Sequence, residues 1–324
     1  MTIELPGLFD LQVNGFGGID FNASDLTSDR VSEAIDRMRR TGVTRCLPTL
    51  ITSSFGQFAG SARAISGTAH AAIAGIHMEG PYISPEDGPR GAHPREHVAP
   101  ASIDDFKKRQ EAADGRIVLV TLAPEVTGAD GLIEHLLATG IRVALGHTAA
   151  TPQQIERAIA AGATLATHLG NGCAQMLPRH PNVIWELLAA DTLFASLIVD
   201  GHHLPASTVK ALVRAKGVDK TMLVTDATAA AGCSPGTYTM GGVTCALGLD
   251  GRVSLPGTPY LAGSALTLDR AIANTVRFTG LPIDVVIPMA STIPANYLGR
   301  STHGVIDADW DQESGELHIR RVTA

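Results

Sequence analysis

The chain has 324 residues, of which 44% are hydrophobic and 4% aromatic, and its formal net charge is −7. This acidic balance argues against nucleic acid as a partner, because proteins that bind it usually present a basic face. No stretch approaches the roughly 18 apolar residues that span a bilayer. Residues 1–10 also lack the basic start and apolar core of a signal peptide. We therefore expect a cytoplasmic protein that binds neither nucleic acid nor membrane.

Eight short runs rich in β-branched and aliphatic residues recur along the chain as candidate strands. They cover residues 8–15, 44–51, 71–80, 116–125, 142–148, 164–170, 194–201 and 221–228. Between them lie Ala-rich amphipathic stretches, such as 28–40, 128–140 and 151–162, whose spacing suits helices covering a parallel sheet. This alternation predicts an α/β fold, a (β/α)8 barrel of the TIM type.

A doubly wound open sheet is the structural alternative. When that fold binds a dinucleotide, G-x-G-x-x-G follows its first strand, and this chain has no such motif there. Nearly every run ends instead in polar residues, namely Gln12, Asn14, Glu79, Glu125, His147, His168, Asp200, His203 and Asp226. Active sites of (β/α)8 barrels lie at the C-terminal ends of the strands, so a barrel would aim this set at one mouth.

Glu79, His147 and His168 end the third, fifth and sixth runs, so they could converge only in three dimensions. One carboxylate and two imidazoles from separate strands would suit a catalytic metal with three protein ligands and an open position. Each residue also has a structural explanation, as a helix cap or a loop contact. Because the chain lacks a local HExxH motif, spacing alone leaves both interpretations open.

Six motifs in a fixed order add a family resemblance. They are HMEGPYIS at 77–84, GHTAAT at 146–151, THLGNG at 167–172, VDGHHL at 199–204, LVTDAT at 223–228 and LAGSALT at 261–267. With them the chain resembles the N-acetylglucosamine-6-phosphate deacetylase family of the amidohydrolase superfamily. The resemblance implies metal-dependent hydrolysis of the N-acetyl group of an amino-sugar phosphate, most simply N-acetylglucosamine 6-phosphate, to the amine and acetate. It also implies one divalent metal per chain on Glu79, His147 and His168, zinc first, with iron, manganese or cobalt as alternatives.

The same resemblance implies roles for other residues. Asp226 would be the catalytic acid–base carboxylate, and His93 would help to polarise the acetyl carbonyl. Substrate contacts would come from Ala92, Asn171, Gly172, Arg179, His203, Leu261, Ala262 and Gly263. Arg179 would bind the phosphate, a role that suits a guanidinium group. His77 shares its strand parity with Glu79, and we expect it to pack inside the barrel rather than to bind metal.

Two features depart from the family pattern. The family usually reads HLxNAM where residues 168–176 read HLGNGCAQM, which bears on the identity of the sugar rather than on the reaction class. Family members also begin with a small β-domain, whereas here LPG opens the barrel at residue 5. We expect a barrel over 5–304, a short C-terminal β hairpin over 305–324, an inserted hairpin over 237–255, and most of the usual accessory β-sandwich to be missing.

Two other functional classes stay open. A related amidohydrolase that deacetylates another N-acyl amino sugar or opens a cyclic amide would keep the metal ligands and Asp226, but it would need neither Arg179 nor His203. A binding protein without activity is the third possibility, and the presence of Asp226 beside the ligands argues against it. The partner is expected to be a small amino-sugar phosphate, and the resemblance together with the frequency of twofold oligomers favours a homodimer.

Gln12 and Asn14 end the first run, where many amidohydrolases carry a His-x-His pair that binds a second metal. Neutral amide oxygens are weak ligands for such ions. We therefore expect both amides to hydrogen-bond to water and to neighbouring side chains, and the chain to hold a single metal.

Overall fold

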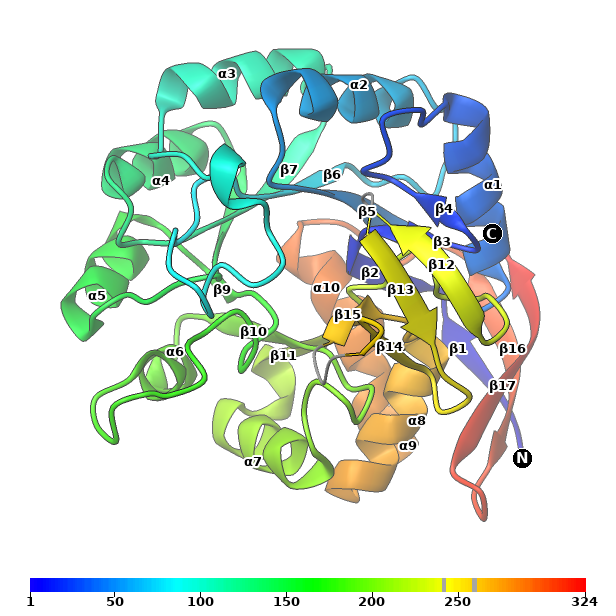
Figure 1. Ribbon diagram of the computed structural model, residues 1–324. Helices are drawn as coiled ribbons and strands as arrows, with labels where there is room; N and C mark the ends of the chain where they lie inside the picture. The colour runs from blue at the N-terminus through cyan, green and yellow to red at the C-terminus, as the bar shows by residue number, and fades with distance from the viewer. Residues whose placement is uncertain (241–242, 258–260) are drawn as a thin grey trace.

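An eight-stranded parallel sheet forms the centre of the computed structural model, which describes residues 1–240, 243–257 and 261–324 (Figure 1). Its strands are β2 (Leu8–Val13), β5 (Val43–Ile51), β6 (Ile76–Glu79), β7 (Ile117–Leu122), β8 (Arg142–Leu145), β9 (Leu165–Ala166), β10 (Phe194–Leu197) and β11 (Thr221–Leu223). They lie side by side in chain order, and every neighbouring pair is parallel. Each strand coincides with one predicted run.

The sheet closes into a barrel at the seam between β2 and β11. An isolated parallel bridge joins Val13 to Ala227. The Asp226 N–H donates to the Gln12 carbonyl over 2.9 Å, and the Asn14 N–H donates to the Ala227 carbonyl over 2.7 Å. The closure is therefore made by residues that follow the strands rather than along a regular ladder. The predicted barrel is confirmed, and the open sheet is wrong.

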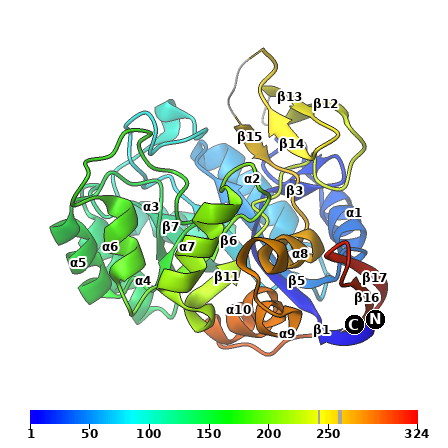
Figure 2. The same cartoon turned by 90° about the horizontal axis from the view of Figure 1, so that it is seen from below.

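Helices surround the barrel and cover the outer face of its sheet (Figures 1 and 2). The longer ones are α1 (Ser28–Arg39), α2 (Phe55–Ser66), α3 (Ile103–Ala112), α4 (Ala129–Ala138), α5 (Pro152–Ala161), α6 (Val183–Ala189), α7 (Ala206–Lys216) and α8 (Leu268–Thr279). Short helical segments are α9 (Ile283–Val286), α10 (Thr292–Tyr297) and the 3-10 turns Arg95–His97, Val218–Lys220 and Ile287–Ala290. In the described part of the chain, no helix is long and apolar enough to cross a membrane.

Local sequence explains where the helices begin. Thr151 accepts a hydrogen bond from the Gln154 N–H, and the Gln154 side chain accepts one from the Thr151 N–H. This capping box, followed by Pro152 in the first turn, satisfies backbone donors that would otherwise lack partners. The predicted helices over 28–40, 128–140 and 151–162 are confirmed as α1, α4 and α5.

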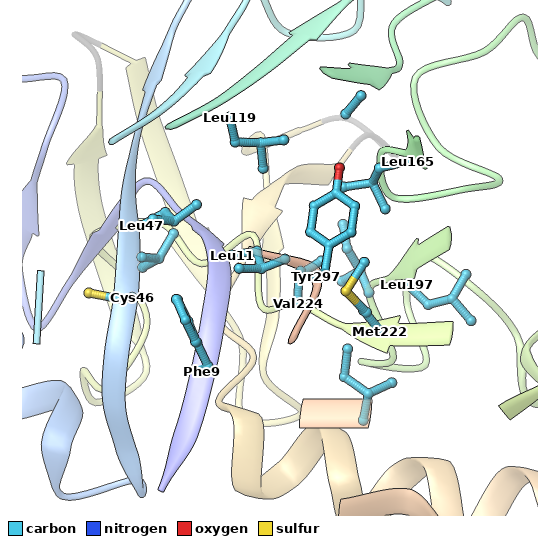
Figure 3. Packing of buried hydrophobic residues seen from close by; sticks show 14 of the residues in the cluster. Phe9, Leu11, Cys46, Leu47, Leu119, Leu165, Leu197, Met222, Val224 and Tyr297 are labelled. Atoms are coloured by element: carbon cyan, nitrogen blue, oxygen red, sulfur yellow. The ribbon is translucent and has the colours of Figure 1, made fainter. Parts of the chain in front are cut away.

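Aliphatic side chains fill the interior of the barrel below its mouth (Figure 3). Leu47, Leu119 and Leu165 are at most 2% exposed, and burying each contributes about 1.5–3 kcal/mol relative to an exposed side chain. Tyr297 of α10 lies among them, and its hydroxyl is 2.9 Å from the Thr164 hydroxyl. This packing makes the barrel a rigid support for the loops that follow its strands.

A three-stranded antiparallel sheet lies beside the barrel, where the two chain ends meet (Figure 2). In it, β16 (Val305–Asp311) pairs with β17 (Glu316–Thr323) on one side and with β1 (Thr2–Pro6) on the other. The C-terminal hairpin therefore forms as expected, but β1 was not anticipated, because five residues ending in proline are a weak strand signal. The division of the chain at residues 304 and 305 stays a prediction.

The inserted segment forms a four-stranded antiparallel sheet rather than the single hairpin expected over 237–255. Its strands are β12 (Gly236–Met240), β13 (Val243–Leu247), β14 (Arg252–Ser254) and β15 (Leu261–Ser264). The expected hairpin turn at 241–242 lies outside the described residues. Ser264 of β15 bridges Ala227, so the insert is attached beside the barrel seam. A small ribbon of β3 (Gly15–Phe16) and β4 (Ile19–Asp20) follows β2.

Candidate active site

Three buried side chains meet at the C-terminal ends of β6, β8 and β9. Glu79 is the last residue of β6, and His147 and His168 each follow a strand closely. The Glu79 Oε1 atom lies 3.2 Å from His147 Nε2 and 3.1 Å from His168 Nε2. The two Nε2 atoms are 3.1 Å apart, and one ligand atom from each residue fits within 4.8 Å of the others. The structure thus brings the predicted metal ligands together.

Backbone strain is concentrated at the same place. Among the described residues, four that are not glycine have a positive φ, and three of them are His147 at 50°, His168 at 30° and Asp226 at 48°. The fourth, Asp114, lies on the surface after α3. Such conformations cost on the order of 1–3 kcal/mol each and persist where the surroundings fix them, most often at functional sites.

The chemistry of the donor set fits a divalent metal. The His147 Nδ1 atom lies 3.0 Å from the Pro89 carbonyl oxygen. A carbonyl can only accept, so Nδ1 carries the hydrogen and Nε2 keeps the lone pair that a metal needs. Burial opposes ionisation of Glu79, but the neighbouring imidazoles of His147 and His168 outweigh it and hold the pKa of Glu79 well below its usual range. The ionised Glu79 carboxylate and the Nε2 lone pair of His147 are the states in which these groups bind a metal.

Two amides at the end of β2, those of Gln12 and Asn14, donate hydrogen bonds to the site's carboxylates. The Gln12 Nε2 atom donates to Glu79 Oε1 over 2.9 Å and to Asp226 Oδ1 over 3.1 Å. The Asn14 Nδ2 atom donates to the same Asp226 oxygen over 2.6 Å. The expected hydrogen bonds to neighbouring side chains are therefore present, and the amides turn their N–H groups toward anions rather than offering oxygens to a second cation.

Asp226 follows β11, and its carboxyl group belongs to the same hydrogen-bonded cluster. Burial raises its pKa above the ordinary value, and the nearby charge of Glu79 acts in the same direction. Hydrogen bonds from the side-chain amides of Asn14 and Gln12 keep the Asp226 carboxylate oriented. A carboxyl group whose pKa moves toward neutrality can both accept and return a proton, as a general acid–base requires.

His93 lies against the same cluster from the loop after β6. Its ring centroid is 4.3 Å from that of His147, and its Nε2 atom is 3.9 Å from Glu79 Oε2. The Nδ1 atom is 2.8 Å from the Thr52 hydroxyl. Burial lowers the pKa of His93 to about 3, so the ring is neutral at physiological pH and can form a hydrogen bond without adding charge.

The loop after β9 packs directly on the candidate ligands. The backbone and side-chain N–H groups of Asn171 donate to the His168 carbonyl over 2.9 and 3.2 Å. A Cβ atom at Gly172 would lie 3.0 Å from His147 Nδ1 and 3.2 Å from His168 Cε1, and its φ is 57°. Glycine at this position therefore lets the backbone approach both imidazoles.

Two further segments with predicted substrate positions lie near Asp226. His203 lies on the loop after β10, and its Nδ1 atom is 2.6 Å from Asp200 Oδ2. The half-buried residues 261–263 belong to β15, whose Ser264 bridges Ala227. A Cβ atom at Gly263 would lie 2.3 Å from Thr228 Cγ2, so β15 packs closely on the segment after Asp226.

Comparison with known proteins supplies the family. Residues 3–311 match the family model described as Amidohydrolase family. N-acetylglucosamine-6-phosphate deacetylase from Bos taurus is 35% identical over 339 residues, covering 98% of this chain and 81% of that protein. N-acetylgalactosamine-6-phosphate deacetylase from Escherichia coli O157:H7 is 34% identical over 300 residues, covering 91% of this chain and 78% of that protein. This chain belongs to the N-acetylglucosamine-6-phosphate deacetylase family of the amidohydrolase superfamily.

Solved structures agree with this assignment. A variant N-acetyl-D-glucosamine-6-phosphate deacetylase from Mycobacterium smegmatis, in complex with N-acetyl-D-glucosamine-6-phosphate, matches this chain with a TM-score of 0.89 at 28% identity. The match covers 99% of this chain and 86% of that one. The deacetylase-family barrel therefore extends over nearly the whole chain.

Two predicted positions, Ala92 and Arg179, have no hydrogen bond, ion pair or ring contact with the cluster in the part of the chain that the structure describes. Ala92 is exposed beside the buried His93. Arg179 is exposed in the loop before α6, and its side chain forms neither a hydrogen bond nor an ion pair with the described residues. The roles of Ala92 and Arg179 stay predictions.

Sequence reasoning also missed residues that support this family's ligands. Thr52 and the Pro89 carbonyl, which hold His93 and His147, carry no motif of their own. Asp10 was overlooked although it shares the strand parity of Gln12.

By contrast, His77 is buried and bonded to the Thr121 hydroxyl over 2.8 Å, and burial lowers its pKa to about 4, which confirms its packed position.

Proposed function

We propose that this chain is a metal-dependent hydrolase that deacetylates N-acetylglucosamine 6-phosphate to glucosamine 6-phosphate and acetate. The observation that carries the proposal is the meeting of Glu79, His147 and His168 with Asp226 at the mouth of the barrel. The family relationship supplies the substrate class. Steady-state assays on phosphorylated and unphosphorylated N-acetylglucosamine, with metal analysis of the same sample, test it directly.

Amide hydrolysis at neutral pH needs an activated water. A divalent metal, with zinc our first choice, would be held by Glu79, His147 and His168 and would lower the pKa of a water from 15.7 to about 7 while polarising the acetyl carbonyl. Asp226 accepts a proton from the water as the water oxygen bonds to the carbonyl carbon. It then gives a proton to the amide nitrogen, so that the C–N bond breaks and a neutral amine leaves.

The surrounding side chains prepare Asp226 for this exchange. Gln12 and Asn14 both donate to Oδ1, which leaves Oδ2 to face the reacting groups. His93, kept neutral by burial, is placed to donate a hydrogen bond to the carbonyl oxygen as charge develops there. Asn171 and Gly172 would contact the sugar beside the imidazoles, and His203 would do so beside Asp226. Leu261, Ala262 and Gly263 would line the remaining side, with Ala92 next to His93.

Replacing Arg179 with methionine should selectively weaken the binding of the phosphorylated substrate. Loss of a hydrogen bond to a charged group costs roughly 1.5–3 kcal/mol, so KM for N-acetylglucosamine 6-phosphate should rise about 10- to 100-fold. Unphosphorylated N-acetylglucosamine serves as the matched control, because its kcat/KM should be unchanged. An equal loss on both sugars would remove Arg179 from phosphate binding.

N-acetylgalactosamine 6-phosphate is the second candidate substrate, because the Escherichia coli relative named for that sugar is 34% identical to this chain. The ratio of kcat/KM for the two epimers decides between them. A third assay on cyclic amides covers the remaining amidohydrolase alternative. A homodimer and a cytoplasmic location, both expected from the sequence, accompany this proposal.

One tightly bound metal per chain is expected. The amides of Gln12 and Asn14 point their N–H groups at Glu79 and Asp226, so these two side chains supply neither an imidazole nor a carboxylate ligand to a second cation. Protein loaded with excess zinc or cobalt and then desalted should contain about one ion per chain by elemental analysis, the number for one site with three protein ligands. The double variant Gln12→His, Asn14→His is the comparison, and two retained ions in the unmodified protein would contradict the expectation.

A further inference from the structure

A second carboxylate is buried beneath Asp226. Asp10 lies on β2, two residues before Gln12, and is 0% exposed. Its Oδ1 atom accepts hydrogen bonds from the backbone N–H groups of Gln12 and Thr225 over 3.2 and 3.3 Å. Its Oδ2 atom accepts the Thr225 hydroxyl hydrogen over 2.5 Å. No cationic side chain pairs with Asp10 among the described residues, which makes its burial costly and calls for a compensating role.

Thr225 connects this carboxylate to the turn that carries Asp226. The Thr225 hydroxyl oxygen donates to Asp10 and accepts the Ala227 N–H over 3.1 Å. Asp226 lies between Thr225 and Ala227 in the sequence and has a φ of 48°. Its own N–H donates to the Gln12 carbonyl over 2.9 Å. The three-residue turn is therefore held on both sides of its strained residue.

The link between Asp10 and Thr225 lies at the seam where β2 and β11 close the barrel. The β2–β11 seam has an isolated bridge where the other neighbouring strands have ladders, so its closure depends on a few backbone and side-chain hydrogen bonds. We propose that Asp10 is a positioning residue that acts through the Thr225 hydroxyl to hold Asp226 in its left-handed conformation. This inference rests on the acid–base role proposed for Asp226.

The direction of the hydrogen bonds explains why a carboxylate stands at residue 10. The Thr225 hydroxyl donates to Asp10 Oδ2 and accepts the Ala227 N–H, so residue 10 has to present an acceptor oxygen to this hydroxyl. An asparagine there could turn its NH2 group toward the same hydroxyl oxygen and compete with Ala227. The turn would then lose its fixed geometry without a change in side-chain size.

The test compares Asp10→Asn, Thr225→Val and the double variant, with Thr225→Ser as the matched control. Both single changes preserve side-chain shape, and serine restores the hydroxyl that valine removes. We expect each single variant to lose at least about 10-fold in kcat per metal-loaded chain, while KM and bound metal stay within about twofold. The kcat of the double variant should be no lower than that of the less active single variant, because both changes break the same link. Thr225→Ser should recover most of the lost kcat.

Several results would overturn the inference. They are unchanged kcat in the single variants, additive losses in the double variant, and losses that track melting temperature while kcat per folded chain is preserved. If Asp10→Asn does not fold, the valine and serine pair at residue 225 decides alone. Full turnover in Asp226→Asn would instead refute the proposed function, so the two failures are distinguishable.

Discussion

Replacing Asp226 with asparagine should lower kcat by a factor of about 10² or more while metal and substrate still bind. The amide has nearly the same shape, but it cannot take the proton of the attacking water or return one to the leaving nitrogen. Stopped assays of acetate release, with KM and metal content measured on the same preparation, give the result.

Asp114→Asn is the matched control for this variant. Asp114 also has a positive φ, at 51°, but it is exposed and lies in the turn between α3 and β7. The same change of charge on the same kind of backbone should leave kcat unaltered there. Near-normal turnover in Asp226→Asn, or an activity loss that only follows loss of metal, would remove Asp226 from the proton transfer.

Glu79→Gln should abolish metal retention and, with it, activity. Glu79 is the single carboxylate of the Glu79, His147 and His168 cluster, and its Oε1 atom faces both Nε2 atoms. Altering a group that merely supports a ligand costs 10- to 100-fold in metal affinity, so replacing this ligand should cost more than about 100-fold. Elemental analysis after desalting and competition with a chelator measure the change.

Glu86→Gln controls for the loss of a negative charge near Glu79 in the sequence, on the loop that follows β6. Glu86 is exposed, seven residues after Glu79, and lies outside the candidate metal cluster. It should retain metal and activity. A Glu79→Gln protein that keeps its metal after desalting would show that this carboxylate is not a required ligand, whatever its activity.

The sequence by itself determined the barrel and the candidate ligands. Strand and helix periodicities are local properties, so the eight runs could be located without knowing which strands are neighbours. The rule that active sites lie at the C-terminal ends of barrel strands placed Glu79, His147 and His168 at one mouth with other polar residues, and the family resemblance singled out these three as ligands. Their motifs added the family.

Tertiary structure decided the features that depend on contacts between distant parts of the chain. The pairing of β1 with β16 joins Thr2 to Asp309, and no local pattern reports such a partner. The same is true of the insert, where β15 pairs with β14 in a four-stranded sheet and also bridges Ala227.

The orientation of the acid–base group was also beyond the sequence. Asp10, Gln12 and Asn14 read as alternate residues of one strand, and their parity predicts a shared face. Their partners come from Thr225 and Asp226, more than 200 positions away, and are set by the way the barrel closes. The sequence therefore determined which groups lie at the mouth of the barrel, because strand periodicity is local. The fold decided which of these groups hydrogen-bond to one another, because that depends on where β2 and β11, the first and last strands of the barrel, meet.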